Sequence, residues 1–334
     1  MQDKIIELVR DKTVKVCCHW DADGVTSGAL IYHMIKPYAK VITTISKGMV
    51  FEVKKEDIAE EEVIICADIP PAKEILDRTV IYIDHHPSEI SEQCTLAIHD
   101  DKYQSCSLLI YENVIEDKTN PYNIFLTLLG FFGDAGKREN LPTMLKVNAM
   151  NYTPELMEKN KSYYSKGHYL TVEKYVSAMN TGKRMNWSGD IPLELLKCID
   201  HYGPFTENFH PLAQTIQTYK SHLRNLYSQD VEIKRVNNFD MIYIESKKNI
   251  QGVLAARNIK EKPIIVINKF QGQLMGSMRV PDTLDFDAGK FLDQFNGKIE
   301  TFLGGGHEKA GGFTIQEKDF PELIEKIKLS SSSQ

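Results

Sequence analysis

The chain has 334 residues, 42% of them hydrophobic and 26% charged, which is ordinary globular composition. Its length favours two domains, and no apolar run approaches the roughly twenty residues that a membrane-spanning helix needs. The net charge of −6 argues against a protein coated with phosphate-binding residues. The six cysteines contain no CxxC pair, so neither a disulfide framework nor a structural zinc site is expected. We expect a cytoplasmic protein without membrane association.

The first 140 residues alternate between strand and helix patterns. Apolar strands are predicted at 14–19, 41–45, 63–68 and 80–84, and helices at 4–10 and 26–34, near 70–77 and 104–115, and at 125–132. Strands that are apolar throughout and alternate with helices indicate a mostly parallel sheet covered on both faces. The predicted fold class is therefore α/β, and Cys66 is expected in its core.

The rest of the chain changes character twice. Residues 141–235 have long amphipathic patterns and predict helical elaboration, ending in a connecting helix at about 208–229. Strand and helix patterns then return, with strands at 240–245, 263–268 and 273–280 and helices at 250–259 and 286–295. The predicted division is 1–140, a catalytic domain; 141–235, helices; 236–329, a smaller α/β domain; and 330–334, a disordered tail.

Polar residues stand where the predicted strands of the first domain end. His19, Asp68 and Asp84 each occupy the carboxyl end of a different strand. Ligands of open α/β sheets bind outside these ends, so three strands deliver metal-type ligands to one edge. Asp21-Ala22-Asp23-Gly24 taken alone is more often a turn or a helix cap. Its position beside the other strand ends indicates a site.

Four motifs follow one another in a recognisable order. They are His19-Trp20-Asp21-Ala22-Asp23-Gly24, Asp68, Asp84-His85-His86, and Gly133-Asp134 after an apolar helix. This pattern resembles the DHH phosphoesterase superfamily, whose members include RecJ exonucleases, nano-RNases, exopolyphosphatases and manganese pyrophosphatases. The resemblance covers the chain apart from its helical middle.

The resemblance implies a two-metal site. Its ligands would be His19, Asp21, Asp23, Asp68, His85 and Asp134. Asp68 would bridge the metals, whereas the division of labour among His19, Asp21 and Asp23 stays open. Carboxylates and imidazoles without thiolates suit Mn²⁺, with Mg²⁺ as the alternative. Two such ions about 3.5–4 Å apart can clamp a phosphoryl group and lower the pKa of a water.

Two further residues would carry catalytic roles. Asp84 would orient His85 or complete the surroundings of the ligands. His86 would face the substrate phosphate and assist charge neutralisation or proton transfer.

A second constellation lies near the C-terminus. Residues 304–312 resemble the Gly-Gly-Gly-His…Ala-Gly-Gly motif of the small DHH-associated domain. A glycine loop would let the amides of Gly304, Gly305 and Gly306 approach phosphate oxygens, with His307 as a further donor. Arg279 would be the bidentate phosphate partner. The alternative is a glycine-rich turn that serves only the fold.

Other charged clusters are interpreted as structural. Residues 182–189 are expected to break the helices, so Lys183, Arg184 and Trp187 are assigned to a solvated loop, with nucleic-acid stacking as the alternative. His99-Asp100-Asp101 follows no predicted strand and is assigned a structural role.

The predicted function is that of a compact, archaeal-type RecJ-like or nano-RNase-like exonuclease. Its partners would be single-stranded DNA or RNA or short oligonucleotides, with a homodimer or a replication-complex partner as a further possibility that the sequence does not decide. One alternative is a phosphoesterase for dinucleotides, cyclic dinucleotides or 3′-phosphoadenosine 5′-phosphate, which fits the negative net charge and the lack of a long basic stripe. A third is an inactive scaffold in a replication complex, for which loss of metal ligands would be the signature.

Overall fold

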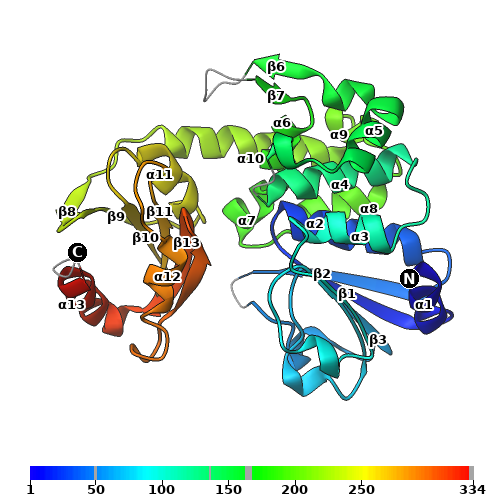
Figure 1. Cartoon of the computed structure of the whole chain (residues 1–334), viewed down its shortest axis with the longest axis horizontal. Helices are drawn as coiled ribbons and strands as arrows, with labels where there is room; N and C mark the ends of the chain where they lie inside the picture. Colours follow the sequence, from blue (N-terminus) through cyan, green and yellow to red (C-terminus); the bar gives the residue numbers. More distant parts are fainter. Residues whose placement is uncertain (49–50, 135–136, 162–167, 331–334) are drawn as a thin grey trace. The chain divides into compact units, whose positions relative to one another are not determined.

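The computed structural model describes residues 1–48, 51–134, 137–161 and 168–330 (Figure 1). It divides into two compact units, Met1–Ser221 and His222–Gln334. None of the helices in the described part of the chain is both long and apolar enough to cross a membrane. Each unit contains a sheet with helices, which confirms the predicted α/β class.

The first unit is built on a five-stranded sheet in the order β2-β1-β3-β4-β5, and all its pairs are parallel. The strands are β1 Thr13–His19, β2 Val41–Lys47, β3 Val63–Ala67, β4 Thr79–Asp84 and β5 Leu96–His99. Sequence patterns missed β5, which has only four residues. Because His99 pairs with Asp84, the expectation that no strand ends at His99 is wrong.

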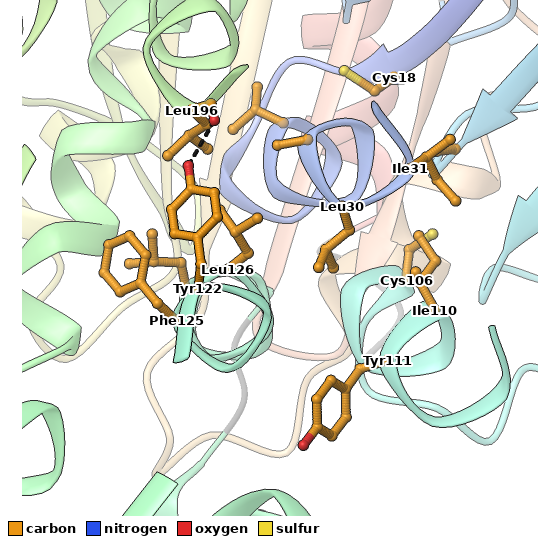
Figure 2. Packing of buried hydrophobic residues seen from close by; sticks show 14 of the residues in the cluster. Cys18, Leu30, Ile31, Cys106, Ile110, Tyr111, Tyr122, Phe125, Leu126 and Leu196 are labelled. Carbon is orange, nitrogen blue, oxygen red and sulfur yellow. Dashed lines mark hydrogen bonds between the residues drawn. The ribbon is translucent and has the colours of Figure 1, made fainter. Parts of the chain in front are cut away.

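Helices cover one face of this sheet, on the upper side of the sheet in Figure 1. The core helices are α2 Ala22–Ile35, α3 Cys106–Asn113 and α4 Pro121–Gly133. Leu30 points from α2 toward α3 and α4, and the hydroxyl of Tyr122 donates a 2.6 Å hydrogen bond to the Leu196 carbonyl (Figure 2). The other helices are α1 Gln2–Val9, α5 Thr143–Tyr152, α6 Glu173–Met179, α7 Thr181–Asn186, α8 Asp190–Cys198 and α9 Gly203–Thr206.

The opposite face is covered by irregular segments and short 3₁₀ turns. Cys66, fully buried as predicted, packs there with Tyr82 and Val53. The helix predicted near 70–77 is wrong, because only the turn Lys73–Ile75 forms. Pro70 and Pro71 have no N–H to donate to a helix, and Pro71 instead forms a parallel bridge with Val53. The other 3₁₀ turns of this unit are Lys55–Asp57, Ser91–Gln93, Arg138–Asn140 and Pro154–Met157.

The middle of the chain is helical, as expected, and also contains a hairpin of β6 Lys159–Lys161 and β7 His168–Leu170. The helix α10, Pro211–Tyr227, matches the predicted connecting helix. It includes the boundary between the two units at Ser221.

The second unit contains a six-stranded mixed sheet in the order β12-β13-β11-β10-β9-β8. Its strands are β8 Lys234–Val236, β9 Phe239–Glu245, β10 Ile264–Phe270, β11 Gln273–Arg279, β12 Leu303–His307 and β13 Ala310–Gln316. Its helices are α11 Gln251–Asn258, α12 Ala288–Asp293 and α13 Phe320–Ser330, with a 3₁₀ turn at Glu317–Asp319. The predicted tail begins at the last residue of α13, and residues 331–334 lie outside the described part.

The glycine run is a strand, so the expected glycine loop is wrong. Gly304, Gly305 and Gly306 lie in β12 and pair with β13. Side-chain packing accounts for one of these glycines, since a Cβ on Gly304 would lie 2.6 Å from the Phe302 ring. Gly306 has φ of +144°, a backbone conformation that only glycine adopts readily.

Candidate metal centre

The acidic and imidazole side chains of the first unit converge at the carboxyl edge of its sheet. β1 ends at His19, β4 ends at Asp84, and Asp68 directly follows β3. Because these neighbouring strands are parallel, their carboxyl ends meet at one edge. Asp134 reaches the same cluster from the C-terminus of α4. Its neighbours Ala135 and Gly136 lie outside the described residues.

These side chains form three overlapping groups. Within each group, potential ligand atoms lie within 4.8 Å of one another: His19, Asp21 and Asp68; Asp23, His85 and Asp134; Asp68, Asp84, His85 and His86. Asp68 belongs to two groups. Its Oδ2 lies 3.6 Å from His19 Nδ1, and its Oδ1 lies 3.5 Å from His85 Nε2.

Asp21 both caps a helix and faces the site. Its Oδ1 accepts a 3.1 Å hydrogen bond from the amide of Gly24 at the start of α2. Its Oδ2 lies 3.0 Å from His19 Nδ1. The close packing of this turn requires Gly24, because a Cβ there would lie 2.4 Å from the His19 carbonyl oxygen. One carboxylate oxygen of Asp21 therefore caps the helix, and the other faces the ligand cluster.

Asp23 is held by a second helix. Its Oδ2 accepts a 2.6 Å hydrogen bond from the Cys106 amide, and its Oδ1 accepts a 3.0 Å bond from the Ser107 amide. Both amides belong to the first turn of α3 and have no partner within the helix itself. A carboxylate at this position is stabilised by the helix dipole. Asp23 is 1% exposed and lies 3.8 Å from His85 Nε2. Asp21 and Asp23 thus face different groups of ligands.

The backbone of Asp68 has an unusual conformation. Its φ is +62°, in the left-handed region, which costs a non-glycine residue about 1–2 kcal/mol. Its amide donates a 2.9 Å hydrogen bond to the Ile83 carbonyl of the neighbouring strand. Within the described residues, its Oδ1 is a buried oxygen without a hydrogen-bond partner. The strained backbone and the unpaired oxygen both belong to the residue that joins the two groups.

His85 provides the test of whether this cluster fits a cation. Its Nδ1 lies 3.1 Å from the Tyr103 carbonyl oxygen, which can only accept, so Nδ1 carries the proton. Its Nε2 lies 3.3 Å from Asp134 Oδ2 and 3.5 Å from Asp68 Oδ1, and no hydrogen-bond partner for it occurs in the described part. A buried nitrogen lone pair among carboxylates is stabilised by a proton or by a metal cation. The donor set therefore fits a divalent metal of the Mn²⁺ or Mg²⁺ type.

Asp84 organises the Asp84-His85-His86 segment. It accepts hydrogen bonds from the amides of His85 and His86, at 2.7 and 3.0 Å, and from His86 Nδ1 at 2.8 Å. The Tyr82 hydroxyl donates to its other oxygen at 2.8 Å. His99 Nε2 lies 2.6 Å from the His86 carbonyl and holds the segment from β5. The side chain of His86 remains 48% exposed.

The pKa values of the cluster show that negative charge is in excess among these side chains. Burial lowers the pKa of His19 and His85, but the surrounding carboxylates raise both values to about 10. Burial and neighbouring carboxylates raise the pKa of Asp23 and Asp134. Burial would also raise the pKa of Asp21, but His19 and Lys183 hold it well below its usual range. Without a metal, the cluster balances its charge by binding protons.

Lys183, which sequence reasoning assigned to a solvated loop, lies beside the ligand cluster. It lies on α7, and its Nζ is 3.7 Å from Asp21 Oδ2 with the side chain 25% exposed. The glycine taken for a breaker, Gly182, is needed for packing, since a Cβ there would lie 2.4 Å from the Ser188 carbonyl oxygen. Burial lowers the pKa of Lys183, an effect that Asp21 opposes.

The segment that follows α7 is fixed to the sheet. Asp190 Oδ1 accepts hydrogen bonds from the Ser46 amide at 3.0 Å and from its hydroxyl at 2.9 Å, and Ser46 lies near the end of β2. Gly189 donates a 2.7 Å bond to the same hydroxyl. Trp187 packs 6.2 Å from the Trp20 ring. These contacts hold the lysine-bearing helix beside Asp21.

The predicted substrate residues lie in the second unit. Arg279 ends β11, and its Nη1 donates to Ser277 Oγ at 3.1 Å and to the Met278 carbonyl at 2.7 Å. His307 ends β12 and is exposed. The Gly304 amide donates to Asn296 Oδ1 at 2.9 Å, so it is already paired. In the described part of this unit, the Gly304 amide is therefore already used, whereas the His307 side chain is exposed.

Comparison with known families agrees with both units. Residues 13–130 match the family model described as DHH family, N-terminal domain, and residues 242–330 match the DHHA1 domain. An uncharacterised protein of Methanocaldococcus jannaschii is 20% identical, over 97% of this chain and 96% of that protein.

Solved structures share the fold. A manganese-bound exonuclease RecJ is 16% identical, with a TM-score of 0.63 over 99% of this chain and 93% of that chain. RecJ of Thermus thermophilus with Mn²⁺ is 15% identical, with a TM-score of 0.67 over 99% of this chain and 54% of that chain. PggH, a pGpG-specific phosphodiesterase of Vibrio cholerae, is 14% identical, with a TM-score of 0.52 over 96% of this chain and 99% of that chain.

Proposed function

Because the chain belongs to the DHH family of metal-dependent phosphoesterases and carries a C-terminal DHHA1 domain, we propose that it is a phosphodiesterase acting as an exonuclease. Its substrates would be single-stranded nucleic acid or short oligonucleotides, and its products mononucleotides. The RecJ proteins that share its fold support this class of reaction. So does the ligand cluster at the carboxyl edge of the sheet.

The observation that carries the proposal is the placement of Asp68 between two groups of ligands. His19 and Asp21 would hold one cation, and Asp23, His85 and Asp134 would hold the other, with Asp68 contributing an oxygen to each. We favour two Mn²⁺ ions, with Mg²⁺ as the alternative. When bound, such a pair supplies Lewis-acid charge to the phosphate and lowers the pKa of a water.

Two cationic side chains of the first unit would serve the phosphate directly. Asp84 holds the proton of His86 on Nδ1, and the hydrogen bond raises the pKa of His86. Its exposed ring would therefore donate a proton or a hydrogen bond from Nε2 to a phosphate oxygen. Asp21 lies near the Lys183 ammonium and offsets its positive charge. Once bound cations neutralise Asp21, the phosphate of an incoming substrate would take over this role. Both residues favour an anionic substrate.

The second unit would bind a further anionic part of the substrate. Arg279 is fixed by Ser277 and by the Met278 carbonyl, so its guanidinium is already oriented for a phosphate. His307 adds an exposed donor. This assignment makes Arg279 a binding residue, separate from the metal ligands.

Product analysis with end-labelled RNA and DNA strands of graded length tests the proposal. We expect Mn²⁺-dependent release of mononucleotides, lost in Asp68→Asn and reduced in His86→Ala. Lys183→Ala should lower kcat without weakening Mn²⁺ binding in calorimetry, whereas Lys183→Arg should retain part of the activity. Undiminished activity in both Asp68→Asn and His86→Ala would refute the mechanism. The exposed carboxylate variant Asp200→Asn is the matched control.

A second candidate is a phosphoesterase for dinucleotides or other small nucleotides. The net charge of −6 favours it, because long strands are usually gripped by basic surfaces. The pGpG-specific enzyme of V. cholerae has a similar fold. The same length series separates the two functions, since cleavage of dinucleotides without cleavage of longer strands would replace the exonuclease assignment. No hydrolysis of any phosphodiester would support an inactive scaffold.

A further inference from the structure

A cleft lies in the first unit beside the metal centre. Its walls are the segments 51–54, 70–74 and 88–93, and its volume is about 790 Å³. This volume is within the roughly 300–1,000 Å³ typical of small-molecule sites. Each of the three segments begins shortly after β2, β3 or β4 ends, and so starts from the sheet edge that carries the ligands. Pro70 is two residues from Asp68, and Ser88 is two residues from His86.

One wall of the cleft carries an exposed aromatic ring that lies close to a candidate ligand. The Phe51 side chain is 57% exposed, and its ring centroid lies 5.6 Å from that of His19. The chain is anchored two residues later, because fully buried Val53 accepts a hydrogen bond from Ala72 at 2.8 Å and donates one to Pro70 at 2.9 Å. Phe51 therefore offers a free apolar surface within one nucleotide's reach of the proposed metal ligands.

The charges of the cleft do not suit a phosphate. Its walls carry three carboxylates, Glu52, Glu74 and Glu89, and two ammonium groups, Lys54 and Lys73. Lys54 already lies 3.6 Å from Glu52. A phosphate would meet net repulsion here, whereas an uncharged ring with amino groups would find an apolar face and hydrogen-bond acceptors.

We propose that this cleft is a nucleoside subsite, in which the base next to the cleaved phosphate stacks on Phe51. The inference rests on the proposed function, which places the phosphate at the metal centre. Every base has a π-face, so stacking would give affinity without strict sequence preference. Removing a stacking ring weakens binding by roughly 5- to 150-fold, and the open setting of Phe51 favours the lower end.

The first test compares Phe51→Ala with the unchanged protein on two substrates. One is a short single strand with all its bases. The other lacks the base at one of the two nucleotides flanking the cleaved bond, and each position is tested. We expect Phe51→Ala to raise KM by roughly 5- to 20-fold on the complete strand. It should have no effect on the strand abasic at the stacked position, and Phe51→Trp should retain the affinity. Equal effects on all strands, or no effect, would overturn the subsite.

Two controls separate the subsite from the rest of the molecule. Phe209→Ala removes another exposed phenylalanine of the same unit, 73% exposed, and should change nothing. Mn²⁺ binding to Phe51→Ala should match that of the unchanged protein in calorimetry. A KM effect of Phe209→Ala as large as that of Phe51→Ala, or weakened Mn²⁺ binding, would overturn the assignment.

A binding measurement keeps the subsite testable without catalysis. In Phe51→Trp, a nucleoside 5′-monophosphate should quench the added tryptophan fluorescence, whereas ribose 5-phosphate should not. Quenching without hydrolysis of any strand would leave the subsite standing and reject the exonuclease. Hydrolysis without quenching would reject the subsite and leave the exonuclease standing.

Discussion

Replacing Asp84 tests how the Asp84-His85-His86 segment is held. The carboxylate is 1% exposed and accepts four hydrogen bonds, three on Oδ1 and one on Oδ2. Asp84→Ala leaves the Tyr82 hydroxyl and two amides without partners. A buried unpaired group costs about 1–3 kcal/mol, so we expect the free energy of unfolding to fall by about 3–5 kcal/mol. Asp84→Asn keeps an acceptor for the amides and should lose only about 1–2 kcal/mol.

The assay is urea unfolding with a chelator present, because bound metal would add its own stabilisation. The matched control is Asp200→Ala. Asp200 also lies 2.7 Å from a histidine, His201, but the pair is exposed and should contribute nothing measurable. An Asp84→Ala variant as stable as Asp200→Ala would refute the reasoning.

The same pair predicts a dependence on pH. The hydrogen bond to Asp84 raises the folded-state pKa of His86, so its contribution to stability is full below the unfolded pKa, near 6.5, and is lost as pH rises through the folded value. The difference in stability between the unchanged protein and Asp84→Asn should therefore be larger at pH 6 than at pH 9. In a plot of activity against pH, the limb that reflects the ionisation of His86 should move to lower pH in Asp84→Asn.

Three further predictions concern the metals, the packing and the second unit. Because the carboxylates raise the pKa of His19 and His85 to about 10, Mn²⁺ must displace protons when it binds. The affinity for Mn²⁺ should therefore rise from pH 6 to pH 9. Calorimetry in buffers of different ionisation enthalpy should show the proton release. A buffer-independent enthalpy would contradict this. Gly130→Ala would favour an isolated helix by about 1 kcal/mol. Its Cβ would nevertheless lie 2.5 Å from Asp23 Oδ1, so unfolding should show a loss of about 1–3 kcal/mol and calorimetry weaker Mn²⁺ binding. A stabilised variant would reject the packing argument. Arg279→Ala should raise KM at unchanged Mn²⁺ affinity, and unchanged kinetics would remove it from the substrate site.

Much of the first unit could be predicted because its central strands contain buried apolar runs. The strand before His19 and the strand before Asp84 were visible as apolar runs with polar residues at their ends. Parallel pairing then requires these ends to meet at one edge. Short β5 lacked such a signal, and its absence from the prediction also hid the contact of His99 with the His86 carbonyl.

Glycines were the least reliable basis for predicting secondary structure, because a glycine can have two opposite structural roles. It can interrupt an element, or it can permit close packing within one. At Gly182 and Gly304 the sequence favoured interruption, but each lies in a regular element where a Cβ would collide with neighbouring atoms. Which role applies depends on how the fold packs nearby atoms, the Ser188 carbonyl oxygen against Gly182 and the Phe302 ring against Gly304.

By itself, the sequence determined the ligand types, their order and their common edge, because these depend on local patterns. Tertiary structure decided which ligands share a group. It turned Asp21 toward His19 and Asp23 toward His85, by capping two different helices with the two carboxylates. It also brought Lys183 to Asp21 across 162 positions of the chain. Such contacts depend on packing between distant segments, which no local pattern records.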